Sequence, residues 1–365
     1  QGKELQLDEI PNVINYFLIS ISDGVPALNI CSTEYCGTEY NELTINEFDV
    51  YRVLSTLNVS KSSLDSILNN KLLRSLSDVL AAPICSLINN SLRQGVVPAQ
   101  WKIARISPIP KGPLVRDIEK DLRPIAITCP VSKVAEVFVS RLFDDFYDDD
   151  NDVNQFGSVI GRSTTLALVK LFHELFEASD NSNNIIRILF VDFSRAFDVI
   201  NHNVIKRKLE EKNSPVILTN WLLSFLNNRE QFVRVNDCNS DCLVINAGAP
   251  QGTRAGPNCF KLLIRDLSFR IPYIKYVDDV SVVSISSDTN DQRCSKYIIL
   301  QVRVQVQVPG LQVQVQVQVH EVQKFRVRVQ VQVLKLQVQV QVQVPSFTFK
   351  YKQQVHFING WLKSP

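Results

Sequence analysis

Apolar residues follow a helical repeat over much of the first half of the chain. Between residues 45 and 92 they recur every three or four positions, which predicts amphipathic helices that turn one face toward a core. The stripe is formed by Leu64, Ile67, Leu68, Leu72 and Leu76. Packing in a hydrophobic core explains these leucines and isoleucine better than a functional role does.

The same period returns further along the chain. One helix is predicted from Val131 to Phe146, and another begins at Ser163 or Thr164, either of which can cap its first turn. Three further helical stretches are expected, over residues 197–209, 221–226 and 260–267.

Other segments have the apolar pattern of β-strands. Residues 101–111 alternate and end in prolines, which stop a strand. Residues 184–191 form an almost continuous apolar run, as in a buried central strand. A strand pair is predicted at 232–235 and 243–245, and β-branched runs on both sides of residues 276–279 predict a tight hairpin.

This order is lost at residue 301, where Gln-Val repeats begin and continue to residue 344. Strict alternation favours β-structure, but the tract is far longer than an average strand of about 5–6 residues. We interpret it as a translated six-base repeat of the coding DNA, which would be prone to aggregate rather than to bind a ligand. Residues 1–44 have no strong period.

Composition restricts the function classes without selecting one. The chain has 365 residues, of which 45% are hydrophobic and 21% charged, as expected of a globular protein of two or three domains. Lys and Arg number 39 against 37 Asp and Glu, so any basic surface for nucleic acid has to be local. No long apolar run and no signal peptide is present, and we predict an intracellular protein of the nucleus or cytoplasm without a membrane segment.

Two residue types give further expectations. The chain has no methionine, which predicts a fragment or a decayed copy of a longer reading frame. Its eight cysteines lack paired CxxC spacing, and Cys238 and Cys242, the closest pair, have no histidine near them. Reduced, mostly buried thiols are therefore expected rather than a zinc site.

Three carboxylates stand where predicted strands end. Asp192 follows the buried run, and Asp278 and Asp279 lie at the turn of the hairpin. Carboxylates from separate elements can hold two Mg²⁺ ions about 3.5–4 Å apart for phosphoryl transfer. Acidic pairs also occur at turns that bind no metal, and the spacing alone leaves both alternatives open. The acidic run at residues 144–150 is expected to be a solvated surface.

Basic residues gather around the first predicted strand. Arg105, Lys111, Lys120 and Arg123 occur within one short stretch. Such a cluster is either a solvated face or a projection that binds phosphate groups.

A series of motifs in residues 101–285 resembles the fingers and palm of a reverse transcriptase of the type encoded by non-LTR retrotransposons of animal genomes. In chain order the matching segments are Trp101 with Pro110-Lys111, Leu122-Arg123-Pro124-Ile125, Gln155-Phe156-Gly157 with Gly161-Arg162-Ser163-Thr164, Phe190-Val191-Asp192-Phe193-Ser194-Arg195-Ala196-Phe197-Asp198, Gly248-Ala249-Pro250-Gln251-Gly252-Thr253, and Tyr276-Val277-Asp278-Asp279.

The resemblance implies an α+β fold, in which an antiparallel palm sheet is backed by helices. It also implies that Asp192, Asp278 and Asp279 form a catalytic triad that binds two Mg²⁺ ions, with Mn²⁺ as an alternative. The implied partners are an RNA template, a DNA primer and deoxynucleoside triphosphates.

The resemblance assigns nucleotide-binding roles as well. Phe197 matches the aromatic ring that excludes a ribose 2′-hydroxyl, although it could instead be a core residue of the following helix. Gln251 and Gly252 match the turn that approaches the template and the incoming base. Lys111 and Arg123 match finger residues that contact the triphosphate.

The chain also departs from the family pattern. We expect residues 1–100 to be a helical extension, 101–285 to be fingers and palm, and 286–365 to be a degenerate tail, so that the thumb is missing. The leading hypothesis is RNA-templated DNA synthesis. The alternative is a catalytically dead relic that at most binds nucleic acid, and an RNA-templated RNA polymerase ranks third because Phe197 argues against it.

Overall fold

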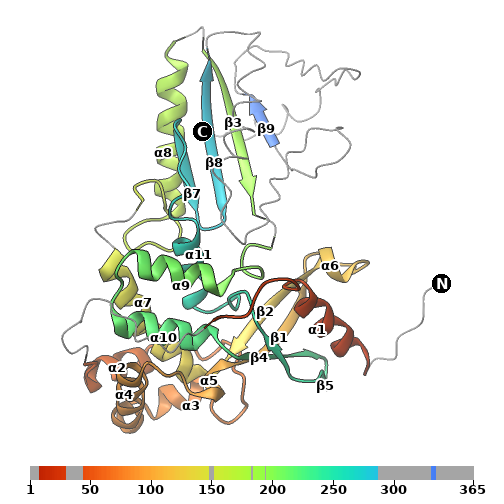
Figure 1. Ribbon diagram of the computed structural model, residues 1–365, viewed down its shortest axis with the longest axis vertical. Helices are drawn as coiled ribbons and strands as arrows, with labels where there is room; N and C mark the ends of the chain where they lie inside the picture. Colours follow the sequence, from red (N-terminus) through yellow and green to blue (C-terminus); the bar gives the residue numbers. More distant parts are fainter. Residues whose placement is uncertain are drawn as a thin grey trace, which may run out of the picture.

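Two β-sheets separated by helices make up most of the described chain (Figure 1). The structure is a computed structural model that describes residues 8–29, 44–147, 152–181, 184–193, 195–286 and 330–333. Side chains are described for these ranges except at residues 185, 192, 286 and 330–333. The mixture of helices and strands confirms the α+β class.

The first sheet has five strands in the order β2-β1-β4-β5, with β6 paired to β4. Its strands are β1 (Ile103–Pro110), β2 (Leu122–Thr128), β4 (Arg229–Val235), β5 (Cys238–Asn239) and β6 (Leu243–Ile245). β1 and β2 form an antiparallel hairpin, whereas β1 and β4 run parallel although they lie far apart in the sequence. The strand pair expected at 232–235 and 243–245 is confirmed as β4 and β6.

The second sheet has four strands in the order β7-β8-β3-β9. They are β3 (Ile185–Asp192), β7 (Tyr273–Tyr276), β8 (Asp279–Ser286) and β9 (Gln330–Val333). β3 pairs with β8 over its whole length, from Ile185 opposite Ser286 to Asp192 opposite Asp279. β9, a short piece of the Gln-Val tract, pairs with the other edge of β3, so the apolar run is a central strand as predicted.

Helices fill the space between the sheets and cover their outer faces (Figure 1). α8 packs against β3, β7 and β8, and α1 packs on β4 of the five-stranded sheet. The helices are α1 (Ile10–Ser20), α2 (Glu47–Ser55), α3 (Asn70–Ser75), α4 (Ser77–Gln94), α5 (Ala99–Lys102), α6 (Ile118–Asp121), α7 (Pro130–Tyr147), α8 (Thr164–Ser179), α9 (His202–Glu211), α10 (Val216–Leu226) and α11 (Ala255–Leu263). Among the described helices, none combines the length and the apolar character needed to cross a lipid bilayer.

The main core joins α2, α4, α7, α9, α10 and α11 to the inner face of β3 and β8. Its largest fully buried apolar side chains include Trp221, Phe225 and Phe260. Burying a side chain of this size contributes about 1.5–3 kcal/mol relative to leaving it in water. This core therefore supports the end of the four-stranded sheet at which β3 and β8 meet the helices.

The helical stripe predicted between residues 45 and 92 is wrong in its central part. Residues 56–69 are not helical, and Ile67 is 77% exposed. Asn58, Asp65 and Asn69 each accept a hydrogen bond from a nearby backbone N–H group, and such local bonds compete with helix formation. The core uses other apolar residues of this region instead, namely Val50, Leu54, Leu73, Ile88 and Leu92.

The helix expected from residue 197 begins later, at His202. The Asn201 side chain caps it, and residues 195–199 form turns in which Arg195 has a positive φ of 53°. At the other predicted cap, Ser163 accepts a hydrogen bond from the Leu166 N–H group, which confirms that interpretation.

The cysteines that the structure describes are all free thiols. Cys85 and Cys259 are buried, whereas Cys129, Cys238 and Cys242 are half-buried or exposed. The expectation of mostly buried thiols is therefore wrong for these three. Cys242 directly precedes β6, and its thiol donates a hydrogen bond to the Glu230 carboxylate.

Candidate active site

Two of the predicted acidic positions are brought together by the register of the four-stranded sheet. Asp192 ends β3 directly opposite Asp279, the first residue of β8. Tyr276 also pairs with Asp279, so that Val277 and Asp278 form the two-residue turn of the hairpin. Asp278 is half-buried and Asp279 is exposed. The three positions thus lie together where β3 ends and β8 begins, which we call the acidic edge. The side chain of Asp192 is not among those that the structure describes.

The turn has an unusual backbone conformation. Val277 has a φ of 56°, a left-handed conformation that β-branched residues rarely adopt. Two-residue hairpins commonly need a positive φ, and glycine or asparagine usually supplies it. Backbone strain of this kind persists only where the surrounding structure enforces it.

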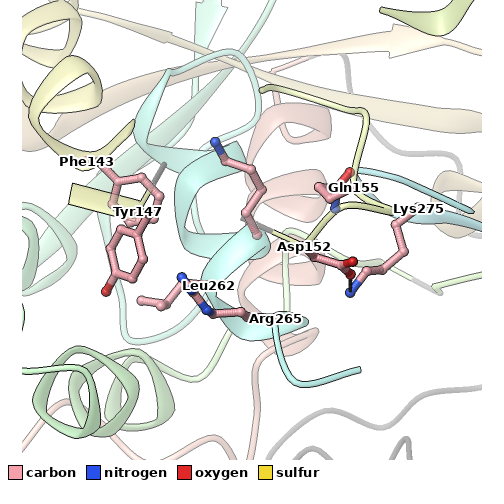
Figure 2. A pocket seen from close by; sticks show the side chains of 8 residues that line it. Phe143, Tyr147, Asp152, Gln155, Leu262, Arg265 and Lys275 are labelled. Atoms are coloured by element: carbon pink, nitrogen blue, oxygen red, sulfur yellow. Dashed lines mark ion pairs between the residues drawn. The ribbon is translucent and has the colours of Figure 1, made fainter. Parts of the chain in front are cut away.

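A buried lysine of β7 connects the hairpin to neighbouring segments, and Figure 2 shows its ion pair with Asp152. Lys275 on β7 is 1% exposed, and its Nζ lies 2.6 Å from an Asp152 carboxylate oxygen. The same ammonium donates hydrogen bonds to the carbonyl oxygens of Ile264 and Leu267, which follow α11. Burial lowers the pKa of Lys275, and Asp152 opposes that effect. The sequence analysis missed this anchor, although a lysine within an apolar strand was a signal for it.

Phe197 lies in the turns that follow β3, next to α11. Its ring centroid is 5.4 Å from that of Phe260, and its carbonyl oxygen accepts a hydrogen bond from the Ala249 N–H group. The side chain is half-buried and lies in a turn, not on a helix. The ring is therefore fixed by the core on one side and partly accessible on the other.

Gln251 joins the five-stranded sheet to the turn that contains Phe197. Its carbonyl oxygen accepts a hydrogen bond from the Ala126 N–H group of β2, and its side-chain amide donates to Asp198 at 3.1 Å. Gly252 has a φ of 105°, and a Cβ there would lie 3.1 Å from the Ala126 carbonyl oxygen. A side chain at this position would be strained, so the close approach of this loop to β2 requires glycine.

Asp198 was given no role in the sequence analysis. Burial raises its pKa, while the Gln251 hydrogen bond and the charges of Arg195 and Lys111 act in the opposite direction. Its position directly after Phe197 was the available signal. Asp198 therefore holds the side chain of Gln251 close to the Phe197 turn.

The basic cluster separates into residues with different partners. Arg105 donates a hydrogen bond to the Ser63 carbonyl oxygen, and Lys120 forms an ion pair with Asp117. Lys111 and Arg123 are exposed on the β1–β2 hairpin, where Arg123 lies opposite Ile109. This hairpin thus carries two exposed cations, and the charge of Lys111 acts against the rise in the pKa of Asp198.

The donor chemistry at the acidic edge suits a divalent cation. Mg²⁺ prefers carboxylate oxygens and keeps coordination positions open for phosphate groups and water. Among the side chains that the structure describes, which do not include that of Asp192, no group of three or more His, Cys, Asp or Glu is arranged around a metal position.

The acidic run at residues 144–150 was predicted to be a solvated surface. Within it, Asp144 forms an ion pair with Lys261, and residues 148–150 lie outside the described residues.

An acidic hairpin in one sheet and a hairpin with two exposed cations in the other are features that a nucleic acid polymerase would use. Comparison with known families is more specific. A model of the family described as reverse transcriptase (RNA-dependent DNA polymerase) matches residues 109–350, which is more than half of the chain. The chain therefore belongs to the reverse transcriptase family, and its identification as a domain of the non-LTR retrotransposon type is confirmed.

Curated relatives from Drosophila melanogaster agree with this assignment. The chain is 27% identical over 257 residues to a probable RNA-directed DNA polymerase from transposon BS, covering 67% of this chain and 28% of that protein. It is 26% identical over 255 residues to the RNA-directed DNA polymerase from mobile element jockey, covering 69% of this chain and 28% of that protein. The aligned part of the chain thus spans little more than a quarter of the length of these relatives.

Proposed function

We propose that this chain performs RNA-templated DNA synthesis at the edge formed by Asp192, Asp278 and Asp279. The observation that carries the proposal is the register of the palm sheet, which places Asp192 opposite Asp279 and next to the Asp278 turn. Family membership supports the reaction class. We assign residues 101–285 to the polymerase fingers and palm, and the family match continues beyond them to residue 350.

The three carboxylates would hold two Mg²⁺ ions. When bound, these ions supply charge stabilisation for the attacking 3′-hydroxyl of the primer and for the leaving pyrophosphate. The remaining steps depend on how the chain places its substrates. Lys111 and Arg123 would contact the triphosphate from the exposed β1–β2 hairpin through charge-assisted hydrogen bonds, which are stronger than those between neutral groups.

Phe197, Gln251 and Gly252 would shape the nucleotide pocket. Gly252, which lies close to β2, would let the backbone approach the base pair. The half-buried ring of Phe197 is held by Phe260 and would lie under the sugar, where it leaves no room for a 2′-hydroxyl. Asp198 would keep the Gln251 amide oriented toward this pocket.

Primer extension tests the proposal directly. The full chain is incubated with a DNA primer on an RNA template, Mg²⁺ and deoxynucleoside triphosphates, and we expect the primer to lengthen and chelation of Mg²⁺ to stop the reaction. Extension that survives Asp278→Asn would contradict the site assignment.

A nucleic-acid-binding function without synthesis is the alternative, supported by the exposed cations Lys111 and Arg123. In that case the primer stays unextended, but the chain binds an RNA–DNA duplex at low salt. Because phosphate contacts release counterions, this binding is expected to weaken steeply as salt is raised. Absence of duplex binding at low salt would exclude the alternative.

We expect Phe197→Ala to admit ribonucleotides. Removing the ring opens space beneath the sugar, so the preference for deoxynucleotides in kcat/KM should fall about tenfold or more. The matched control is Phe193→Leu, because Phe193 also contacts Phe260, at 5.5 Å between ring centroids, but is itself buried. Unchanged sugar discrimination in Phe197→Ala would show that the ring is only a core residue.

A further inference from the structure

The motif at residues 155–157 runs along the acidic hairpin, and the proposed function gives it no role. The Phe156 N–H group donates to the Lys275 carbonyl oxygen at 2.8 Å, and the Lys275 N–H group donates to the Asn154 carbonyl oxygen at 2.7 Å. Gln155 and Lys275 therefore form a parallel bridge. The segment acts as a short extra strand beside β7. Figure 2 shows Gln155 near Lys275.

The Gln155 side chain reaches the turn itself. Its Oε1 accepts hydrogen bonds from the N–H groups of Gly157 and Val277, both at 3.0 Å. Gln155 is 5% exposed, so water cannot easily replace these bonds. Val277 is the residue with the left-handed φ, and it directly precedes Asp278. One buried oxygen thus binds the backbone at the strained position of the hairpin.

Two neighbours make this contact rigid. A Cβ on Gly157 would lie 2.5 Å from both the Val277 backbone nitrogen and its Cγ2, so the two backbones meet as closely as glycine allows. Arg162 donates hydrogen bonds to the carbonyl oxygens of Asp152 and Gln155, and its guanidinium lies 5.5 Å from the Phe156 ring centroid. The loop that contains Gln155 is therefore held by contacts on both sides of this residue, at Asp152 and at Gly157.

We propose that Gln155 is a positioning residue, which fixes the Val277–Asp278 turn and thereby the placement of the Asp278 carboxylate for metal binding. This inference rests on the proposed function, because it assumes that Asp278 is a metal ligand. Residues that orient a ligand through a hydrogen bond commonly affect metal affinity by about 10–100-fold. A residue that only filled space would not act through an acceptor oxygen.

The test compares Gln155→Met with Gln155→Glu in the full chain. Methionine has a similar length but no equivalent acceptor, whereas glutamate keeps an acceptor oxygen. Mn²⁺ binding is measured by electron paramagnetic resonance, and the part lost in Asp278→Asn is taken as the site signal. We expect Gln155→Met to weaken this binding about tenfold and Gln155→Glu to retain it. Equal binding in Gln155→Met and wild type, or loss in both variants, would overturn the proposal.

Amide hydrogen exchange gives a second measurement that needs no metal. We expect Gln155→Met to raise exchange at least tenfold at residues 276–279 while β3 stays protected. Gln231→Met is the control, since Gln231 is also a buried glutamine but donates a hydrogen bond to Asn15 on α1. Unchanged exchange at the hairpin in Gln155→Met would refute the positioning role.

The two measurements also separate this inference from the proposed function. If the wild type shows no Mn²⁺ binding that depends on Asp278, the proposed metal site fails, and hydrogen exchange alone decides the role of Gln155. If Gln155→Met does not fold, Arg162→Met provides a second test, because it removes the hydrogen bonds that hold the loop containing Gln155 and leaves the chemistry of the Gln155 side chain unchanged. It is then expected to raise exchange at residues 276–279, and unchanged exchange would count against the proposal.

Discussion

Primer extension by the Asp278→Asn variant is expected to fall by about a thousandfold, the scale of losing a group that stabilises charge in a transition state. Asparagine has the same size as aspartate and tolerates turn conformations, so the hairpin should keep its shape. It lacks the negative charge that a divalent cation requires from its ligand. The loss should therefore appear in kcat rather than in the affinity for the primer–template duplex.

The control for this variant is Asp237→Asn. Asp237 follows β4, its side chain is fully exposed, and it forms an ion pair with Arg234. This change removes one carboxylate from the chain without touching the palm, so extension should remain close to that of the wild type. Similar activities for Asp278→Asn and Asp237→Asn would show that the acidic hairpin is not the catalytic site.

The Glu136→Ala variant is expected to lose about 2–6 kcal/mol of unfolding free energy, because two backbone N–H groups lose their acceptor at a cost of about 1–3 kcal/mol each. Glu136 on α7 is 1% exposed and accepts hydrogen bonds from the N–H groups of Arg254 and Ala255, where α11 begins. Burial raises its pKa, and the Arg229 charge acts against that increase. Arg229 is itself 2% exposed, and its guanidinium lies 4.6 Å from the Phe225 ring centroid. Alanine would leave the two N–H groups without their acceptor and would remove a negative charge that acts on the buried Arg229.

Urea unfolding, followed by tryptophan fluorescence, measures the loss. Glu136→Gln keeps an acceptor for the α11 amides and should cost less than Glu136→Ala. The double variant Glu136→Met with Arg229→Met removes both charges and should be more stable than the sum of the single losses predicts. Glu177→Ala is the surface control, since its side chain is 73% exposed, and should change stability by less than about 0.5 kcal/mol. A loss below about 1 kcal/mol in Glu136→Ala would contradict a structural role for the buried Glu136 carboxylate.

Local patterns predicted the elements around the site well. The β7–β8 hairpin, the buried strand β3, helix α7 and the Ser163 cap all follow from period, turn residues and capping residues within a few positions. The prediction failed between residues 56 and 69, where polar side chains bind the backbone locally and interrupt a leucine repeat. In this segment, side-chain hydrogen bonds to the backbone compete with helix formation, and the spacing of hydrophobic residues does not measure that competition.

The contacts that hold the site together could not be predicted in this way. Gln155 reaches the Val277 amide, Lys275 reaches Asp152, and Glu136 caps α11, each across more than a hundred residues of sequence. Nothing in the spacing of these residues states that they meet. The parallel pairing of β1 with β4 is another contact of this kind.

The sequence alone predicted which residues carry the chemistry, because each motif of the family is a short string of side chains whose types and order can be read directly. It also established the α+β class, because apolar periods of two and of three to four residues reflect local backbone geometry. Only the tertiary structure decided that Asp192 lies opposite Asp279 and that a buried glutamine binds the turn before Asp278. Strand register and buried hydrogen bonds join distant segments, and they arise only when the whole core packs.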